Sequence, residues 1–197
     1  MNRTTLAALG LGALALPTPL ARADFIEYEQ NFAGWLAAAG SYTTITFMGY
    51  SDGTLVTNQY SSLGVMFTSA DIDTISGPSS FVYPQDGWGL DGNAIIELTF
   101  AQPITAVGWH FPGILKATFY LGQAQVAFDV QSGFSGNAAN FTGFAGDLQF
   151  DRIRLFSDNF PQGNVNLDNL YFQTIPTPGV GVALIGLAFT RPQRRRR

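Results

Sequence analysis

The chain has 197 residues, no cysteine and a formal net charge of −4. This value is the sum of two parts of the chain with opposite net charge. Seven arginines lie in the two end segments, while the stretch between them carries fourteen acidic and three basic residues, a net charge of −11. A domain this acidic excludes nucleic acid and anionic lipid as partners, and the missing cysteines exclude disulfides and thiolate chemistry.

The N-terminus has the layout of a secretory signal peptide. A basic start at Arg3 precedes an apolar run of eleven residues, Leu6–Leu16, and the small residues Ala21 and Ala23 flank Arg22. We expect signal peptidase to cleave after Ala23. Residues 1–23 are therefore predicted to be removed, and the rest of the chain to be exported.

Residues 24–174 are predicted to form one domain that begins with the only helix, Asp24–Gly40. Phe32, Trp35, Leu36 and Ala39 recur at helical spacing and form one apolar face, and Gly40 is a natural end. The rest of the domain consists of short runs in which apolar and polar residues alternate, as in half-buried strands. These runs are Thr43–Phe47, Gly64–Thr68, Ile96–Phe100, Val107–Phe111, Lys116–Leu121, Val126–Val130, Arg152–Leu155 and Asn166–Gln173.

The strand pattern predicts an all-β fold, because many short strands without alternating helices favour an antiparallel β-sandwich. We expect a jelly-roll-like architecture, with a hairpin turn at Gly122-Gln123. The predicted core between the two sheets contains six aromatic residues. They are Trp109, Phe111, Phe119, Phe128, Phe150 and Phe172.

Residues 175–197 have the layout of a sorting signal. The motif Pro176-Thr177-Pro178-Gly179 leads into an apolar segment, Gly179–Phe189, and the chain ends on Arg194, Arg195, Arg196 and Arg197. The apolar segment has eleven residues, whereas a stable membrane span needs roughly 20. The arginines are expected to stay on the cytoplasmic side, so we expect transient contact with the inner membrane.

This tail resembles the PEP-CTERM sorting signal of Gram-negative bacteria, in which a Pro-Glu-Pro motif precedes a short hydrophobic segment and an arginine-rich end. Thr177 stands where that family usually has glutamate. The resemblance implies processing by an exosortase, a place in the cell envelope, on the cell surface or in the extracellular matrix, and a link to exopolysaccharide and biofilm. The strand pattern of the domain, for example at Thr44–Phe47 and Val165–Phe172, is similar to that of other exported domains with this tail, and it implies no defined activity.

Catalytic residues are scarce. His110 is the only histidine, and a catalytic triad or a histidine-based zinc site cannot be assembled around it without further partners. We expect it to be a strand residue on the less apolar face. A glycoside hydrolase would need two carboxylates across a cleft, and the sequence does not pair any two of the obvious candidates. These are Glu97, Asp86, Asp91, Asp129, Asp151 and Asp168.

The segment Asp86–Asn93 is predicted to be an oxygen-rich loop, and it contains Trp88 among glycines and aspartates. Trp88, Tyr83, Asp86 and Asp91 form the best candidate sugar site, because an aromatic ring with polar neighbours suits a sugar. The alternative is that the segment binds no ligand and is only a turn supported by its glycines.

No cofactor is required, but Asp168 is a candidate ligand for a structural calcium ion. In carbohydrate-binding jelly rolls, such a calcium often takes a second ligand from a glutamate near the first strand. Met48 stands in that place here. Arg152 and Arg154 share one strand face, where they are expected to offset the acidic surface or, alternatively, to hold an acidic polysaccharide.

The sequence therefore predicts an exported, non-enzymatic protein of the cell surface or extracellular matrix. A carbohydrate-binding module that contacts extracellular polysaccharide through Trp88 is the first alternative. A small glycoside hydrolase is the second.

Overall fold

A computed structural model describes residues 25–68, 73–77, 85–111, 115–132, 140–157 and 163–175, without the side chains of residues 128–132. The predicted signal peptide and the sorting signal from Pro176 onward lie outside these ranges, as does Tyr83. Within the described ranges, no helix is long and apolar enough to cross a membrane.

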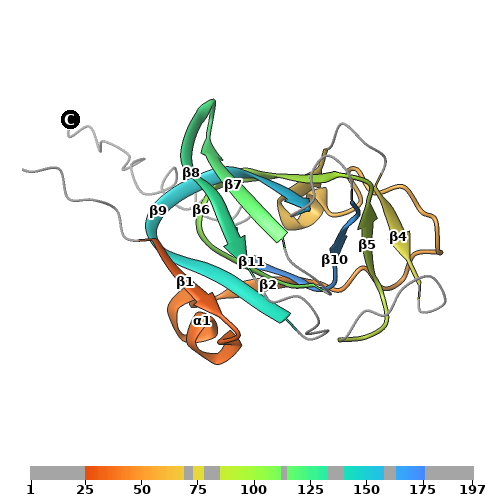
Figure 1. The fold of residues 1–197 in the computed structure, drawn as a ribbon, viewed down its shortest axis with the longest axis horizontal. Helices are drawn as coiled ribbons and strands as arrows, with labels where there is room; N and C mark the ends of the chain where they lie inside the picture. The colour runs from red at the N-terminus through yellow and green to blue at the C-terminus, as the bar shows by residue number, and fades with distance from the viewer. Residues whose placement is uncertain are drawn as a thin grey trace, which may run out of the picture.

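The domain is an antiparallel β-sandwich, as predicted (Figure 1). In the described residues the larger sheet runs in the order β2 (Tyr42–Ile45), β11 (Leu170–Gln173), β6 (Ile95–Phe111), β9 (Asn140–Ser157), β7 (Leu115–Leu121), β8 (Ala124–Ser132). Two more strands join this sheet, β1 (Phe25–Glu29) beside β9 and β3 (Val65–Phe67) beside β6. The smaller sheet has the order β10 (Val165–Leu167), β5 (Gly89–Gly92), β4 (Thr74–Ser76).

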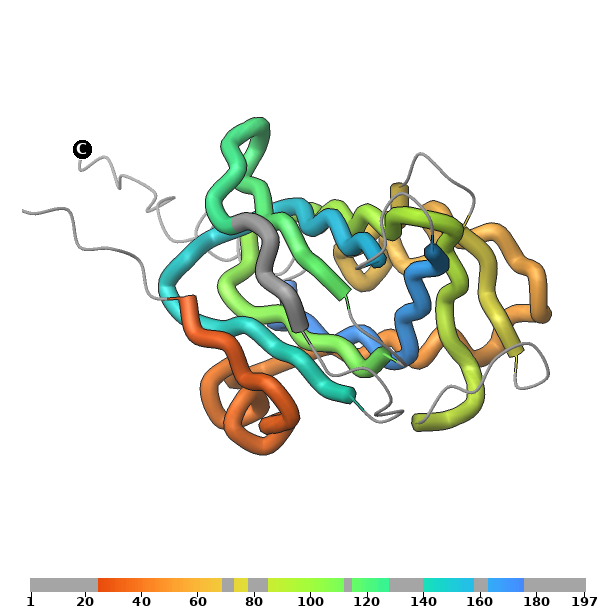
Figure 2. The backbone as a smooth tube through the Cα atoms, viewed as in Figure 1, coloured from red at the N-terminus to blue at the C-terminus, as the bar shows by residue number. Residues whose placement is uncertain are grey.

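Strands β6 and β9 are long enough to bend around the core, as the cyan tube of β9 shows in Figure 2. The first part of β6 pairs with β3 and its last part with β11. The pairing between β6 and β9 shifts register on both sides of Ile104. Such irregularities bend a strand and let one sheet wrap over itself, which is how this domain closes into a jelly-roll-like sandwich.

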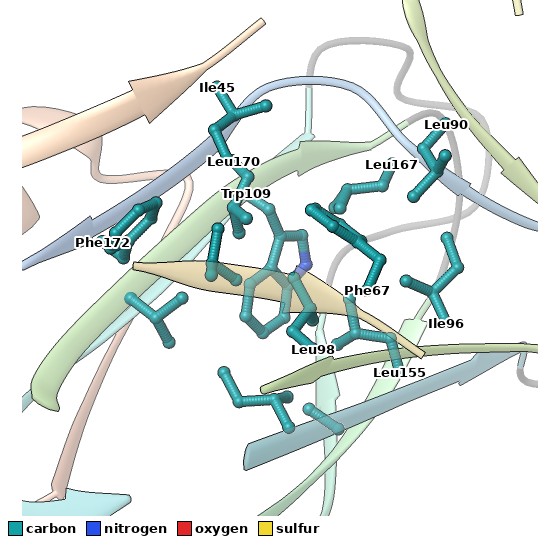
Figure 3. Close-up of a cluster of buried hydrophobic side chains, with 14 of the residues drawn as sticks. Ile45, Phe67, Leu90, Ile96, Leu98, Trp109, Leu155, Leu167, Leu170 and Phe172 are labelled. Atoms are coloured by element: carbon teal, nitrogen blue, oxygen red, sulfur yellow. The ribbon is translucent and has the colours of Figure 1, made fainter. Parts of the chain in front are cut away.

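The main core lies between the layers and follows the predicted alternation. Trp109 is fully buried and lies in the middle of the cluster, with Phe67, Leu98, Leu155 and Leu170 around it (Figure 3). The prediction is confirmed for five of its six aromatic residues, and the side chain of Phe128 is not among those described. The five are Trp109, Phe111, Phe119, Phe150 and Phe172.

The predicted helix Asp24–Gly40 is wrong in its first part. Phe25–Glu29 forms β1 and pairs with β9, and the ring of Phe25 stacks on Phe144 at 5.1 Å. Helix α1 (Phe32–Ala39) begins after Asn31, whose side chain accepts a hydrogen bond from the N–H of Gly34 (2.9 Å). This segment is a strand because it pairs with β9, which lies more than a hundred positions further along the chain. A partner so distant cannot be inferred from the local sequence.

The apolar face predicted for the helix is confirmed. It packs against the outer side of the large sheet and forms a second core with Ala106, Phe141 and Tyr171. Trp35 is fully buried there, and its Nε1 donates to the backbone oxygen of Phe144 at 3.1 Å. The helix ends at Gly40, whose φ of 69° is readily adopted by glycine. The fold thus has a second hydrophobic layer outside the sandwich.

The predicted last strand, Asn166–Gln173, is in fact two strands. It breaks at Asp168-Asn169, so that β10 joins the smaller sheet and β11 the larger one. At the break, the backbone N–H of Asp168 donates to His110 O, and His110 N–H donates to Asn169 O, both at 2.9 Å. The predicted hairpin turn at Gly122-Gln123 is confirmed between β7 and β8. The break between the two sheets places Asp168 in the interior.

Candidate functional site

The segment Asp86–Asn93 is only partly a loop, because Gly89–Gly92 forms strand β5 of the smaller sheet. The loop prediction is therefore wrong for these four residues, where pairing with β4 and β10 replaces turn hydrogen bonds. Asp86 satisfies a neighbouring backbone group, as expected for an aspartate in a turn, because its Oδ1 accepts the N–H of Trp88 at 3.0 Å. Asp91 lies between Thr74 and Asn166 in the sheet, and burial raises its pKa.

Trp88 is half-buried and packs against the main core. Its ring lies over Gly77, where an added methyl group would meet the indole edge at 3.4 Å. The smaller sheet thus holds Trp88 in place and leaves only part of the ring accessible. Sugar contact at Trp88, Asp86 and Asp91 stays a prediction, and Tyr83 lies outside the described residues.

Among the charged residues that the structure describes, Asp168 alone has a completely buried side chain (0% exposed). Its Oδ2 accepts the N–H of Gln85 at 2.9 Å, whereas Oδ1 has no hydrogen-bond partner in the described part of the chain. Burial raises the pKa of Asp168 to about 7, the nearby charge of Asp86 adds to the rise, and the N–H groups of Gln85 and Asn169 oppose it. A buried acceptor without a partner is costly, so this carboxyl group needs either a proton or a cation.

A calcium ion at Asp168 stays a prediction. The side-chain oxygens of Asn166 and Asn169 are also buried and without partners among the described residues, and calcium prefers such oxygen ligands. However, the described ranges contain no group of three His, Cys, Asp or Glu side chains placed to hold a metal. Met48, which takes the place of the expected glutamate, is about half exposed (53%).

His110 lies on the face of β6 opposite Trp109, the less apolar face as predicted, yet it is buried (6% exposed). Helix α1 covers that face, so the imidazole lies 5.5 Å from the ring of Phe32 and 5.2 Å from that of Phe141. Its Nδ1 is 3.1 Å from the hydroxyl of Tyr171. Burial lowers the pKa of His110 to about 4. The only histidine is thus a neutral core residue that links β6 to β11.

Glu97 lies on the outer face of β6 and is partly exposed (24%), in agreement with the predicted solvent-facing position. It has a cationic partner, since Arg152 Nη1 is 3.4 Å from Glu97 Oε2. Asp151 accepts the N–H of Gly122 with both oxygens at 3.0 Å and so supports the β7–β8 turn. Both carboxylates therefore have structural partners, whereas a glycoside hydrolase would place two carboxyl groups opposite each other across a cleft.

The structure also contains a pocket that the sequence analysis missed. It has a volume of about 270 Å³ and lies where β6 shifts register, beside the end of β11. Its polar lining consists of amide and hydroxyl groups and includes no charged side chain. The lining residues are Gln102, Pro103, Ile104, Thr105, Gln149, Gln173, Thr174 and Ile175.

The side chain of Gln173 is held in a defined orientation in this pocket. Its Oε1 accepts the backbone N–H of Thr105 at 3.0 Å, which leaves its Nε2 group to donate elsewhere. Gln173 pairs with Tyr42 across β11 and β2, so the two side chains leave the same face of the sheet. The ring of Tyr42 is held edge-on by Trp35 (5.9 Å) and Tyr171 (6.3 Å), yet Tyr42 is 42% exposed. The one sign in the sequence was Pro103, because proline inside a strand marks an edge or a bulge.

Comparisons with known proteins identify no family for this chain. No protein-family model matches the chain, and no curated protein matches it. Similar solved structures include two variants of a family 29 carbohydrate-binding module, studied for ligand recognition. An arginine-to-alanine variant is 17% identical, with 68% of this chain and 91% of that chain covered and a TM-score of 0.33. An aspartate-to-alanine variant is 18% identical, with 67% and 89% covered and a TM-score of 0.32. A similarity of this size says nothing about the ligand of this chain.

Proposed function

We propose that the domain is a non-enzymatic glycan-binding module of an exported cell-surface or extracellular-matrix protein. The observation that carries this proposal is the uncharged, amide-lined pocket beside Tyr42. In a domain with a net charge of −11, a concave site built from glutamine and threonine side chains is chemically distinct from the surface around it.

The lining matches the chemistry of neutral sugars. A sugar hydroxyl both donates and accepts hydrogen bonds, and amide and hydroxyl side chains do the same. Gln102 and Gln149 are exposed and supply both kinds of group, while Gln173 is already oriented by Thr105. The exposed ring of Tyr42 offers an apolar surface for the C–H face of a sugar. A few fixed polar groups next to an aromatic surface are typical of small-ligand sites.

The test is binding of the full chain to soluble neutral polysaccharides, namely a β-glucan, a mannan and a xylan, measured by calorimetry. Tyr42→Ala and the double variant Gln102→Ala/Gln149→Ala should each weaken binding about tenfold, which corresponds to losing roughly one well-placed contact. Tyr50→Ala is the matched control, because Tyr50 is also an exposed tyrosine but packs on Tyr60 instead. Thermal unfolding of each variant checks that the fold is intact.

Two outcomes would contradict this assignment in different ways. If none of the polysaccharides binds, the glycan-binding function is wrong. If one binds but the pocket variants bind it as tightly as the wild type does, the pocket is wrong, and Trp88→Ala then tests the loop that the sequence predicted.

We further propose that the protein is exported, that signal peptidase removes its signal peptide, and that an exosortase sorts it. The three-part tail supports this, as does its position directly after the domain: Thr174 N–H donates to Ser41 O (3.0 Å), and Ile175 lies against Gly64. The intact mass of the protein from envelope and medium fractions tests it. Loss of residues 1–23 together with the tail is expected, and an intact arginine end in the membrane fraction would contradict exosortase processing.

A further inference from the structure

The three basic residues of residues 24–174 all lie on one face of the large sheet. Arg152 and Arg154 leave the outer side of β9, because their neighbours Ile153 and Leu155 are fully buried in the core. Lys116 leaves the same side of β7, next to the buried Ala117. In a domain with fourteen acidic residues, the clustering of all three basic residues on one face indicates that this face has a role of its own.

The strand pairings place these residues in adjacent rows. Arg152 pairs with Thr99 on β6 and with Tyr120 on β7. Arg154 pairs with Glu97 on β6 and with Thr118 on β7 in the next row. Lys116 follows one row further, opposite Phe156. Paired residues leave the same face of a sheet, so Tyr120, Thr99 and the three cations form one surface, which we call the basic face, while Thr118 between them is buried (8% exposed).

The guanidinium of Arg152 is held in a defined orientation. Its Cζ lies 4.1 Å from the centroid of the Tyr120 ring, and its Nη1 is 3.4 Å from Glu97 Oε2. The side chain remains 25% exposed. Guanidinium groups are planar donors that bind carboxylates in a bidentate manner. A guanidinium already fixed by stacking loses less conformational entropy when an anion binds to it.

We propose that the basic face binds a carboxylated polysaccharide, in which uronate groups bind Arg152 and Arg154 and a hydroxyl of the sugar rings binds the partly exposed Thr99. A sheet face several strands wide suits an extended chain, and the carboxylates repeat along such a polymer as the cations repeat from row to row. Glu97 occupies part of the donor capacity of Arg152 in the free protein, so it competes with the ligand. This surface is separate from the amide-lined pocket and does not depend on it.

The test compares binding to polygalacturonate with binding to neutral dextran and to polyglutamate, an anionic polymer without sugar. The C-terminal arginines would bind any polyanion, so every protein in the series is the full chain with Arg194→Gln, Arg195→Gln, Arg196→Gln and Arg197→Gln. The measurements are made near 0.15 M salt, where the screening length is about 8 Å and the net negative charge of the domain matters less.

We expect Arg152→Gln and Arg154→Gln each to weaken polygalacturonate binding about tenfold, as is typical for the loss of a charge-assisted hydrogen bond. Glu97→Gln should strengthen it severalfold, because it removes the competing carboxylate. This gain cannot come from a damaged fold, so it keeps the test decisive even if an arginine variant unfolds. The arginine variants should bind neutral glycans as the wild type does.

Three results would overturn the proposal. They are the absence of polygalacturonate binding, binding that none of the three variants changes, and equally tight binding of polyglutamate, which would mean that the face recognises charge and not sugar. None of them bears on neutral polysaccharides in the pocket, so the failure of this inference and that of the proposed function are distinguishable.

Discussion

Replacement of Asp168 by asparagine should stabilise the calcium-free protein above neutral pH. The carboxyl is fully buried, and its pKa rises from 3.8 to about 7 in the folded state. Between these two values the folded protein holds a proton that the unfolded chain has released. Its stability therefore falls as the pH rises through this window and levels off above pH 7.

The magnitude follows from the pKa values. A difference of about 3 units at 1.36 kcal/mol each means that ionising Asp168 in the folded protein costs on the order of 4 kcal/mol. The asparagine side chain would keep an acceptor for the Gln85 N–H without carrying the charge. Asp168→Asn should therefore match the wild type near pH 4 and exceed it increasingly up to pH 8, by roughly 10 °C in Tm for a chain of this size.

The assay is thermal unfolding of both proteins in EDTA from pH 4 to pH 8.5. A stability difference that does not change with pH would refute the reasoning, because burial of the charge would then not be the cause. Repeating the series with calcium tests the predicted ion separately. A bound calcium should raise the Tm of the wild type at pH 8 and leave that of Asp168→Asn unchanged, and equal responses of the two proteins would exclude Asp168 as a ligand.

Three further changes have defined outcomes. His110→Gln should reduce the loss of stability on acidification, because the pKa of His110 falls from 6.5 to about 4 on folding. Between these two pH values the free energy of unfolding of the wild type falls by about 3 kcal/mol. The difference in unfolding free energy between wild type and variant should narrow by that amount, and a constant difference would contradict the reasoning. Gly143→Ala should destabilise the domain by about 1–3 kcal/mol in denaturant unfolding, because an added methyl group would overlap the indole of Trp35; unchanged stability would mean that α1 packs differently. Trp88→Ala should lower the Tm by several degrees, because Trp88 packs against the core; loss of glycan binding without loss of stability would instead support the sugar contact predicted there.

Local sequence patterns were sufficient for most of the strands, for the helix after its first part and for the core. Alternation with a period of two identified β6 and β9 in part and put Trp109 and Phe150 inside, since burial on one face of a strand selects every second residue. The spacing of Phe32, Trp35 and Ala39 identified the buried face of α1 for the same reason, at the helical period. The glycine at position 122 marked the hairpin, because its φ of 58° suits a tight turn.

Only the tertiary structure decided which strands meet and in what register. β1 became a strand through its pairing with β9, and the break at Asp168-Asn169 arose because one run serves two sheets. The pocket exists because β6 shifts register at Ile104, and the basic face because Arg152 lies opposite Tyr120. Each of these depends on contacts between residues far apart in the chain. The free energy of such contacts comes from the packing of whole layers, and no short window of sequence contains it.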